Sequence, residues 1–336
     1  MIFSHALRET LHQLLATDPR VVLLGEDIAD PYGGAFKVTA GLSTAFPDRV
    51  RTTPVSEAAI TGISTGLALA GYRPIVEIMF GDFLALCFDQ IINHVSKYQA
   101  MYHGNATCPV ILRTPSGAGK GYGPTHSQSL EKHFLGIPHL KVAAASLYHD
   151  PLEIFRNFLL KESPILYIEH KLLYPMQMSL PNEGKIGMLL SRTFASEGFL
   201  PTLSISPLPR GECTTTIVSY GYQAVVVEKI IQKLAVEEEI FAELLVPSQL
   251  SPVDYDPIIQ SVTQTGSLVT IEEGTAGWAY GTEIASVVYQ RRFKNLRHPI
   301  EILTSQATVI PSAKHLERQM LVQENVIEET LRKVAL

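Results

Sequence analysis

The sequence alternates short, continuous apolar runs with helical patterns, and this alternation constrains the fold more than any other feature. In the first half the runs are rich in Val, Ile and Leu, as expected for strands buried on both faces of a parallel sheet. They occupy residues 20–27, 73–80, 108–115, 140–146 and 164–170. Helical spacing separates them at 4–17, 57–71, 83–102 and 151–161. The pattern predicts an α/β fold with a parallel sheet flanked by helices.

The alternation is interrupted once and then resumes. Residues 181–210 are rich in Pro, Ser and Gly and carry no sustained period, so we expect them to connect two domains. Beyond them, strand patterns at 214–221, 239–246, 266–274 and 299–304 alternate with helical patterns at 222–235, 255–265, 281–290 and from about 312. We therefore predict one α/β domain over residues 1–180 and a second over residues 211–336.

Composition excludes several classes of protein. Hydrophobic residues make up 46% of the 336 residues, and the formal net charge is −6, which argues against disorder and against a nucleic-acid partner. The three cysteines are widely spaced, which favours a reducing cytoplasm over a disulfide framework or a zinc site. No apolar run approaches the ~20 residues of a membrane helix, and the N-terminus lacks the order of a signal peptide. We expect a cytoplasmic protein that does not bind a membrane.

A glycine-rich segment, RTPSGAGKGYGPTHSQS, follows one of the predicted strands, and ligands of open α/β sheets bind beyond the carboxyl ends of strands. Its composition suits a loop that holds phosphate, but its spacing does not match a P-loop. His126 closes the segment. A single histidine in a loop is more often structural, yet a titratable group at the end of a flexible glycine loop often lines an active site.

A single acid, Glu57, begins the apolar helical pattern in TTPVSEAAITG. A purely structural explanation is available, because Ser56 can cap the helix and an acid in the first turn gains roughly 0.3–1 kcal/mol from the helix dipole. Gly62 and Gly66 lower helix propensity by about 1 kcal/mol each. We expect that the missing side chains at these glycines let another backbone or a flat ligand come close to the helix. We also expect Glu57 to be at least partly buried.

Four motifs resemble, in order and spacing, the beta subunit of 2-oxo acid dehydrogenases. This is the thiamine-diphosphate-dependent decarboxylating component. The motifs are LLGEDIADPYGGAF, TTPVSEAAITG, EIMFGDF and THSQSLEKHFLGIPHLKV. Three later motifs are similar to the transketolase C-terminal domain, so the resemblance covers nearly the whole chain. They are YGYQAVVVEKI, VTIEEGTAGWAYGTEI and IPSAKHLE. The resemblance implies a transketolase-like pyrimidine-binding domain followed by a transketolase C-terminal α/β domain.

The resemblance implies catalytic roles for two residues. In this family the glutamate matching Glu57 hydrogen-bonds the aminopyrimidine ring of thiamine diphosphate and favours its imino tautomer, which activates the thiazolium carbon. His126, in HSQ, resembles the histidine that acts near the substrate and in passing the acyl group to a lipoyl arm.

The same match implies a pocket for the cofactor rings. Val55, Met79 and Phe83 would line it, and Glu26, in GED, would lie near its mouth. Plain core packing is the alternative for Met79 and Phe83.

Half of the expected cofactor site is missing from the sequence. The family holds the diphosphate through a metal bound by Gly-Asp-Gly and a later Asn, whereas Gly81-Asp82 is followed here by Phe83. The resemblance therefore implies that a separate alpha subunit holds the diphosphate and Mg²⁺, in an assembly of two alpha and two beta chains. We expect no metal ligands in this chain. Lys161 and Ser163 stand where relatives bind structural potassium, so we expect no potassium either.

These observations favour a beta subunit that decarboxylates a small 2-oxo acid with its alpha partner and passes the acyl group to lipoamide on a transacylase. VPSQLSP at 246–252 departs from the family pattern. It keeps open a biosynthetic relative that delivers the acyl unit to a carrier protein or a second carbonyl. A third possibility is a non-catalytic assembly subunit, against which Glu57 and His126 argue.

Overall fold

The computed structural model describes residues 1–181, 190–196, 199–209 and 211–335. The chain forms two compact units. The first comprises Met1–Gly117 and His133–Ser179, and the second comprises Ala118–Lys132 and Leu180–Leu336. The glycine-rich segment therefore belongs, from Ala118 on, to the second unit, although the residues on either side of it belong to the first.

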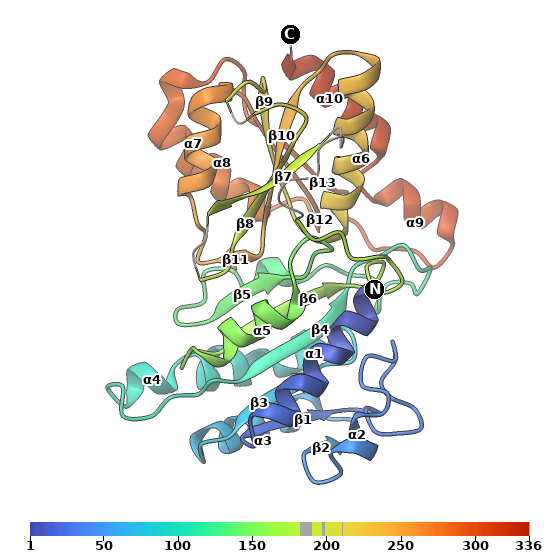
Figure 1. Ribbon diagram of the computed structural model, residues 1–336, viewed down its shortest axis with the longest axis vertical. Coiled ribbons are helices and arrows are strands. Elements are labelled where there is room, and N and C mark those ends of the chain that lie inside the picture. The colour runs from blue at the N-terminus through green and yellow to red at the C-terminus, as the bar shows by residue number, and fades with distance from the viewer. Residues whose placement is uncertain (182–189, 197–198, 210, 336) are drawn as a thin grey trace. The chain divides into compact units, whose positions relative to one another are not determined.

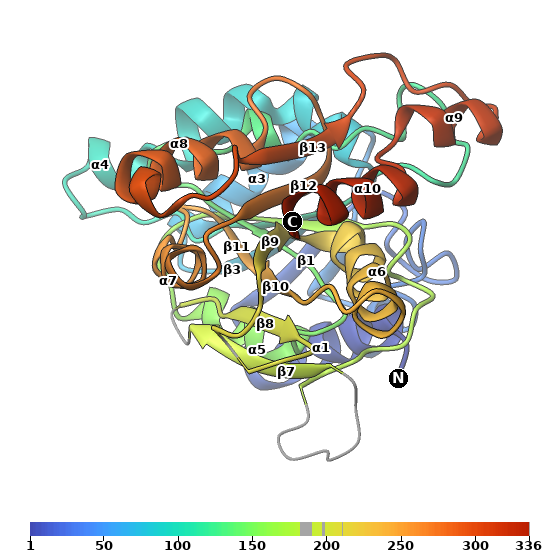
Figure 2. The ribbon, with the colours of Figure 1, turned by 90° about the horizontal axis from the view of Figure 1, so that it is seen from above.

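The first unit is built on a parallel sheet, as the apolar runs predicted. Its strands follow the order β5-β6-β4-β3-β1-β2, and every neighbouring pair is parallel. They are β1 (Val21–Gly25), β2 (Val50–Thr52), β3 (Arg73–Glu77), β4 (Ile111–Ser116), β5 (Lys141–Ala144) and β6 (Ile165–His170). The helices are α1 (Phe3–Thr17), α2 (Leu42–Ala45), α3 (Glu57–Leu69), α4 (Tyr98–Met101) and α5 (Pro151–Leu159). In Figures 1 and 2, α3 lies on one face of this sheet and α1 with α5 on the other.

Strand register brings the segments that carry chemistry to one edge of this sheet. Gly25 pairs with Glu77, and Glu77 pairs with Arg113, so β1 and β3 end side by side while β4 continues beside them to Ser116. The helix α5 begins as predicted, because the Asp150 carboxylate accepts a hydrogen bond from Leu152 N at 3.0 Å and Pro151 occupies the first turn.

The predicted helix at 83–102 is three shorter elements. A 3-10 helix, η1, runs over Gly81–Cys87, a π-helix, η2, over Gln90–Val95, and α4 follows. Their buried apolar residues recur every three or four positions, at Leu84, Cys87, Ile91 and Val95. This spacing is met by tight, regular and wide helical turns alike, so the pattern predicted helicity and left the type of turn undetermined.

The second unit contains a mixed sheet in the order β13-β12-β9-β10-β8-β7. Its strands are β7 (Ser191–Ser196), β8 (Thr202–Ser206), β9 (Thr215–Ser219), β10 (Ala242–Pro247), β12 (Leu268–Thr275) and β13 (Glu301–Ser305), and a short strand, β11 (Gln249–Ser251), follows β10. Its helices are α6 (Gly221–Glu237), α7 (Asp256–Thr265), α8 (Tyr280–Arg292), α9 (Lys314–Met320) and α10 (Glu324–Ala335). Figures 1 and 2 show α6 and α10 on one face of this sheet and α7 and α8 on the other.

Two strands lie in the segment that we expected to be only a connection. β8 pairs antiparallel with β10, and β7 pairs antiparallel with β8. The polar sequence of β8 gave no sign of a buried strand. Ser204 is nevertheless buried, and it donates a hydrogen bond to Glu243 Oε1 at 2.5 Å. Residues 182–189, 197–198 and 210 of that segment lie outside the described part of the chain.

The helical pattern from about 312 is interrupted. α9 ends at Met320, Leu321 is extended, and α10 begins at Glu324. The Gln323 side chain donates a hydrogen bond to the Leu321 carbonyl at 2.6 Å, which stabilises the break. Within the described ranges, the helices are too short or too polar to span a bilayer.

Candidate active site

Glu57 is the first residue of α3, and its side chain is buried. Ser56 caps the helix, since its Oγ accepts a hydrogen bond from Ala59 N at 3.4 Å. Both the cap and the burial were predicted. The residue is only 4% exposed, whereas an acid that merely complements a helix dipole already gains roughly 0.3–1 kcal/mol at an exposed position. Burying a carboxylate is unfavourable unless something binds it, so capping alone does not explain Glu57.

Glu26 directly follows β1 and is also 4% exposed. Burial raises the pKa of Glu26, the charge of Glu57 raises it further, and a hydrogen bond from the Ser56 backbone opposes both. The two carboxylates are therefore electrostatic neighbours. Glu26 Oε1 is buried and has no hydrogen-bond partner among the described residues. A buried unsatisfied oxygen costs about 1–3 kcal/mol, so this atom fits a ligand that brings a hydrogen-bond donor.

Met79 and Phe83 follow β3 at the same edge of the sheet. Both are half-buried, and β3 and η1 pack against α3. The Phe83 ring meets the Phe80 ring edge to face, with centroids 5.9 Å apart. Val55 precedes the helix cap and is 80% exposed. Two buried carboxylates thus lie on segments adjacent to partly accessible apolar side chains, an arrangement suited to a flat ring that carries nitrogen donors and acceptors.

His126 lies in the second unit, whereas the five other predicted site residues lie in the first. Its side chain is half-buried, and its Nδ1 is 3.0 Å from Thr125 Oγ1. Its backbone N–H donates to the Gly123 carbonyl at 3.4 Å. The imidazole therefore sits on a turn at the end of the glycine-rich segment.

The glycines of this segment alternate because the backbone is left-handed at every second residue. The φ angles are positive at Gly117 (87°), Gly119 (89°), Gly121 (74°) and Gly123 (81°). Residues with a Cβ rarely adopt this conformation, which explains the alternation. Successive N–H groups in such a backbone form a concave site for anions.

The anions in that site are carboxylates of the chain itself. Glu317 accepts hydrogen bonds from Gly119 N at 2.9 Å and from Gly121 N at 3.0 Å. Glu273 accepts one from Ala118 N at 2.8 Å. The glycine-rich composition, which resembles that of a phosphate-binding loop, is thus explained by binding of the chain's own glutamates. This agrees with a spacing that does not match a P-loop.

A buried ionic cluster in the first unit was missed by the sequence reasoning. Arg113 donates from Nε to Glu169 Oε1 at 2.8 Å and from Nη2 to Oε2 at 2.6 Å, and it also pairs with Glu77. Tyr174 donates to Glu169 Oε2 at 2.7 Å. Burial disfavours the charge of Arg113, but Glu169 and Glu77 outweigh it and raise its pKa. The available signal was the presence of Glu77, Arg113 and Glu169 within three otherwise largely apolar strands.

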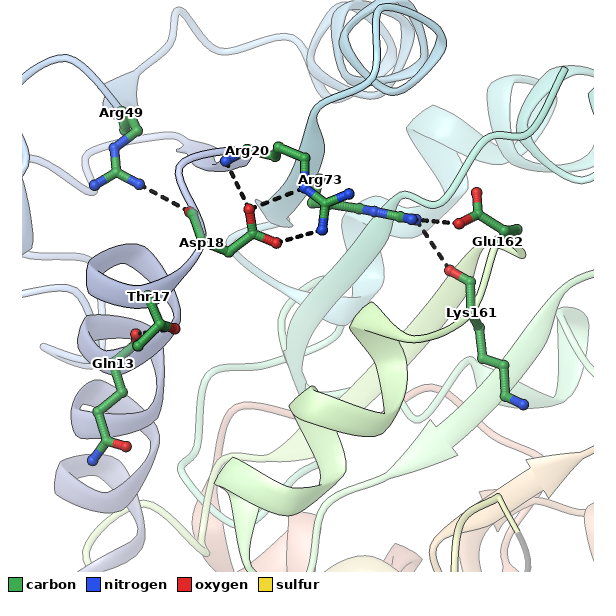
Figure 3. Close-up of polar contacts among 8 residues, drawn as sticks. All are labelled: Gln13, Thr17, Asp18, Arg20, Arg49, Arg73, Lys161 and Glu162. Atoms are coloured by element: carbon green, nitrogen blue, oxygen red, sulfur yellow. Dashed lines mark hydrogen bonds and ion pairs between the residues drawn. The ribbon is translucent and has the colours of Figure 1, made fainter.

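A second polar cluster lies at the positions considered for potassium. Arg73 donates to the Lys161 carbonyl at 3.2 Å and forms an ion pair with Glu162. Figure 3 shows the Lys161 ammonium pointing away from Arg73. A guanidinium thus supplies positive charge to this carbonyl. In the described ranges, no three His, Cys, Asp or Glu side chains gather as a metal site would require.

Comparisons with known proteins place this geometry in a family. Residues 1–177 match the transketolase pyrimidine-binding domain, and residues 207–327 match the transketolase C-terminal domain. The beta subunit of acetoin:2,6-dichlorophenolindophenol oxidoreductase from Cupriavidus necator is 33% identical over 339 residues, 98% of this chain and 95% of the relative. The beta subunit of the pyruvate dehydrogenase E1 component from Rickettsia felis is 32% identical over 338 residues, 98% of this chain and 96% of the relative.

The chain belongs to the E1-like beta-subunit family of thiamine-diphosphate-dependent 2-oxo acid dehydrogenases. The family extends to eukaryotic organelles, since a mitochondrial pyruvate dehydrogenase E1 beta subunit from Arabidopsis thaliana is 31% identical over 99% of this chain and 89% of the relative. A solved structure, a split-gene transketolase described as an inactive beta4 tetramer, matches with a TM-score of 0.73 at 18% identity, covering 100% of this chain and 99% of that one. This likeness shows the fold, and it confirms the expected pair of transketolase-like α/β domains.

Proposed function

We propose that this chain is the beta subunit of a 2-oxo acid dehydrogenase that works with a separate alpha subunit. The complex decarboxylates a small 2-oxo acid and transfers the acyl group to lipoamide carried by a transacylase. The observation that carries the proposal is the buried carboxylate pair, Glu26 and Glu57, at the carboxyl edge of the parallel sheet. The charged groups that act on Glu26 include Glu57 and Asp27, and both raise its pKa.

Thiamine diphosphate, when bound, supplies the electron sink that the loss of CO₂ requires. Glu57 would hold the pyrimidine ring by sharing a proton with a ring nitrogen, and burial strengthens such a hydrogen bond because the local dielectric is low. Glu26 would accept a hydrogen bond through its buried Oε1. Val55, Met79 and Phe83 would exclude water from the rings.

His126 would act on the substrate side of the reaction. An imidazole accepts a proton in its neutral form and gives it back from its protonated form, which suits both the decarboxylation step and acyl transfer to a lipoyl arm. Its place at the end of an ordered turn gives it a defined orientation.

The alpha subunit would supply the diphosphate and Mg²⁺ site. Asp82, the acid of the incomplete Gly-Asp motif, is 8% exposed and lies inside η1. The exposure of an apolar side chain on α3, Ile63 at 55%, supports a partner surface on this helix. Nothing in the described part of the chain comes within 4 Å of a Cβ built at Gly62 or Gly66. The open space at these glycines supports close approach by a group outside this chain, which we take to be the alpha subunit of a two-alpha, two-beta assembly.

The cellular location we propose is the cytoplasm. Cys87, Cys108 and Cys213 are all buried free thiols. Burial raises their pKa values above the usual range for a thiol, which keeps them unreactive.

A biosynthetic acyl-transferring relative is the second candidate. The departure at VPSQLSP places Ser248 just after β10, where it is 1% exposed and its Oγ lacks a hydrogen-bond partner in the described residues. Such a relative would use the same carboxylate pair but pass the acyl unit to a carrier protein or a second carbonyl.

Reconstitution separates these candidates. The chain is co-purified with its alpha partner and assayed with thiamine diphosphate, Mg²⁺ and a series of 2-oxo acids, using either a lipoyl domain or a carrier protein as acceptor. We expect acylation of the lipoyl domain, with the lone chain inactive. Acylation of the carrier protein alone would favour the second candidate, and CO₂ release by the lone chain would contradict both.

A further inference from the structure

The loop that carries His126, residues 118–132, is bound to the rest of the second unit by two glutamates that lie far away in the sequence. Glu273 is at the end of β12, and Glu317 is in α9. Both are almost fully buried, at 8% and 1% exposure. Their partners in the loop are backbone N–H groups and a hydroxyl, so the sequence of the loop gives no sign of the contact.

Glu273 joins the two ends of the loop. One oxygen atom, Oε1, accepts hydrogen bonds from Ala118 N at 2.8 Å and from Ser129 Oγ at 3.0 Å. Lys132 reinforces this end, because its ammonium donates to the carbonyls of Thr275 and Gly277, each at 3.0 Å. The loop is therefore closed at its base by the last residues of β12 and by Gly277 beyond it.

Glu317 holds the glycine stretch. Its two oxygens accept from Gly119 N and Gly121 N, a two-point charge-assisted contact. The backbone here lies against the start of α9. A Cβ at Gly123 would be 2.4 Å from Ser312 Oγ, and one at Gly121 would be 3.1 Å from the Ser312 carbonyl oxygen. Three residues beyond Gly123 the chain reaches His126.

We propose that Glu273 and Glu317 are positioning residues for His126. By fixing the base and the glycine stretch of the loop, they hold the imidazole in one place for the proposed acyl chemistry. The loop would otherwise be free to open, since its three glycines with positive φ angles, Gly119, Gly121 and Gly123, lose much conformational entropy when they are ordered. This inference rests on the proposed function for the role of His126. The set of hydrogen bonds from the loop to Glu273 and Glu317, which we call the clamp, is a property of this chain alone.

Hydrogen exchange tests the clamp without cofactor or partner. In Glu317→Gln the side chain keeps its shape but offers one acceptor in place of two. We expect the amides of residues 117–126 to exchange roughly tenfold faster, as the loss of a hydrogen bond to a charged group predicts. Glu329→Gln, on the exposed face of α10, makes the same charge change and should leave this peptide unaffected. Glu317→Asp retains two acceptors and should show an intermediate rate.

Kinetics of the reconstituted complex test the positioning role. We expect Glu317→Gln to lower kcat about tenfold with little change in the Kd for thiamine diphosphate, and Glu317→Asp to recover part of the rate. Unchanged exchange in both variants would overturn the clamp, and faster exchange with wild-type kcat would overturn the positioning role. If the wild-type complex lacks activity, the proposed function fails, while the exchange result still decides whether the clamp exists.

Discussion

Glu26 and Glu57 are buried to the same extent, each 4% exposed, at the end of β1 and the start of α3. Burial and then the charge of Glu57 raise the pKa of Glu26. Two close carboxylates in a low-dielectric site are unfavourable for folding. Such pairs persist where a ligand uses them, which is why this relationship carries more weight for function than the glycine-rich loop does.

Replacing Glu57 with Gln in the reconstituted complex should lower kcat by about 10²–10⁴-fold, because a neutral amide cannot exchange a proton with the cofactor ring. Stopped-flow measurement of CO₂ release would detect this change. Ser56→Ala is the matched control. It removes the helix cap and should cost about 1 kcal/mol of stability while leaving kcat near the wild-type value. Equal losses of rate in the two variants would mean that Glu57 acts only at the helix terminus.

The exposed face of α3 should be an assembly surface. A Cβ at Gly62 would have no atom within 4 Å in the described part of the chain outside its own helix backbone, so Gly62→Leu starts from open space. It should raise the helix propensity by about 0.8–1 kcal/mol and leave the isolated chain at least as stable as the wild type. We expect it to weaken alpha-subunit binding at least tenfold in sedimentation velocity experiments. Glu153→Leu adds the same side chain to α5 and should bind the partner normally. Normal assembly of Gly62→Leu would place the partner elsewhere.

The ionic cluster around Arg113 should be critical for stability. Arg113→Met leaves the carboxylates of Glu77 and Glu169 buried without their cation, a change that costs about 3–5 kcal/mol in comparable sites. Urea denaturation would measure it. Arg20→Met breaks the Asp18 pair shown in Figure 3, whose arginine side chain is 55% exposed, and should cost less than about 1 kcal/mol. Similar losses in both variants would contradict the assigned importance of burial.

Stability should fall with rising pH because of Glu272. This side chain is 3% exposed, and burial, with a smaller effect of Glu131, raises its pKa from 4.5 to about 7. Since the folded state binds the proton more tightly than the unfolded state, the stabilisation is complete below pH 4.5 and is lost as pH rises through 7. Between pH 5 and pH 8 the loss should be roughly 2–3 kcal/mol.

Glu272→Gln removes this titration. Its stability relative to the wild type should therefore improve by about that amount between pH 5 and pH 8, as measured by urea denaturation at each pH. A difference between the two proteins that does not vary with pH would show that Glu272 titrates normally.

Local sequence patterns predicted the elements that bury apolar side chains. They missed the elements that bury hydrogen-bonded polar side chains. The continuous runs that became β3 and β6 predicted the parallel sheet, and Ser56 correctly marked the start of α3. β8 escaped detection because a buried serine, Ser204, has its hydrogen-bond acceptor on Glu243, 39 residues away in the sequence. A hydropathy pattern does not encode such partners.

The unit to which the glycine-rich loop belongs could not be predicted, for a related reason. Ala118 and Glu273 are 155 residues apart, and Gly119 and Glu317 are 198 residues apart. Backbone N–H groups exist in every residue except proline, so nothing in the loop's sequence identifies its partners. The candidate site residues themselves came from motif resemblance, and their roles are predictions that the experiments above address.

The most direct test of the central claim is the rate of CO₂ release from 2-oxo acids by the chain mixed with its alpha partner, compared with the chain alone and with the Glu57→Gln complex. We predict turnover that requires both subunits and thiamine diphosphate and that falls at least about a hundredfold in Glu57→Gln. Turnover by the lone chain, or an unchanged rate in the Glu57→Gln complex, would contradict the claim that this chain supplies the acid side of a shared cofactor site.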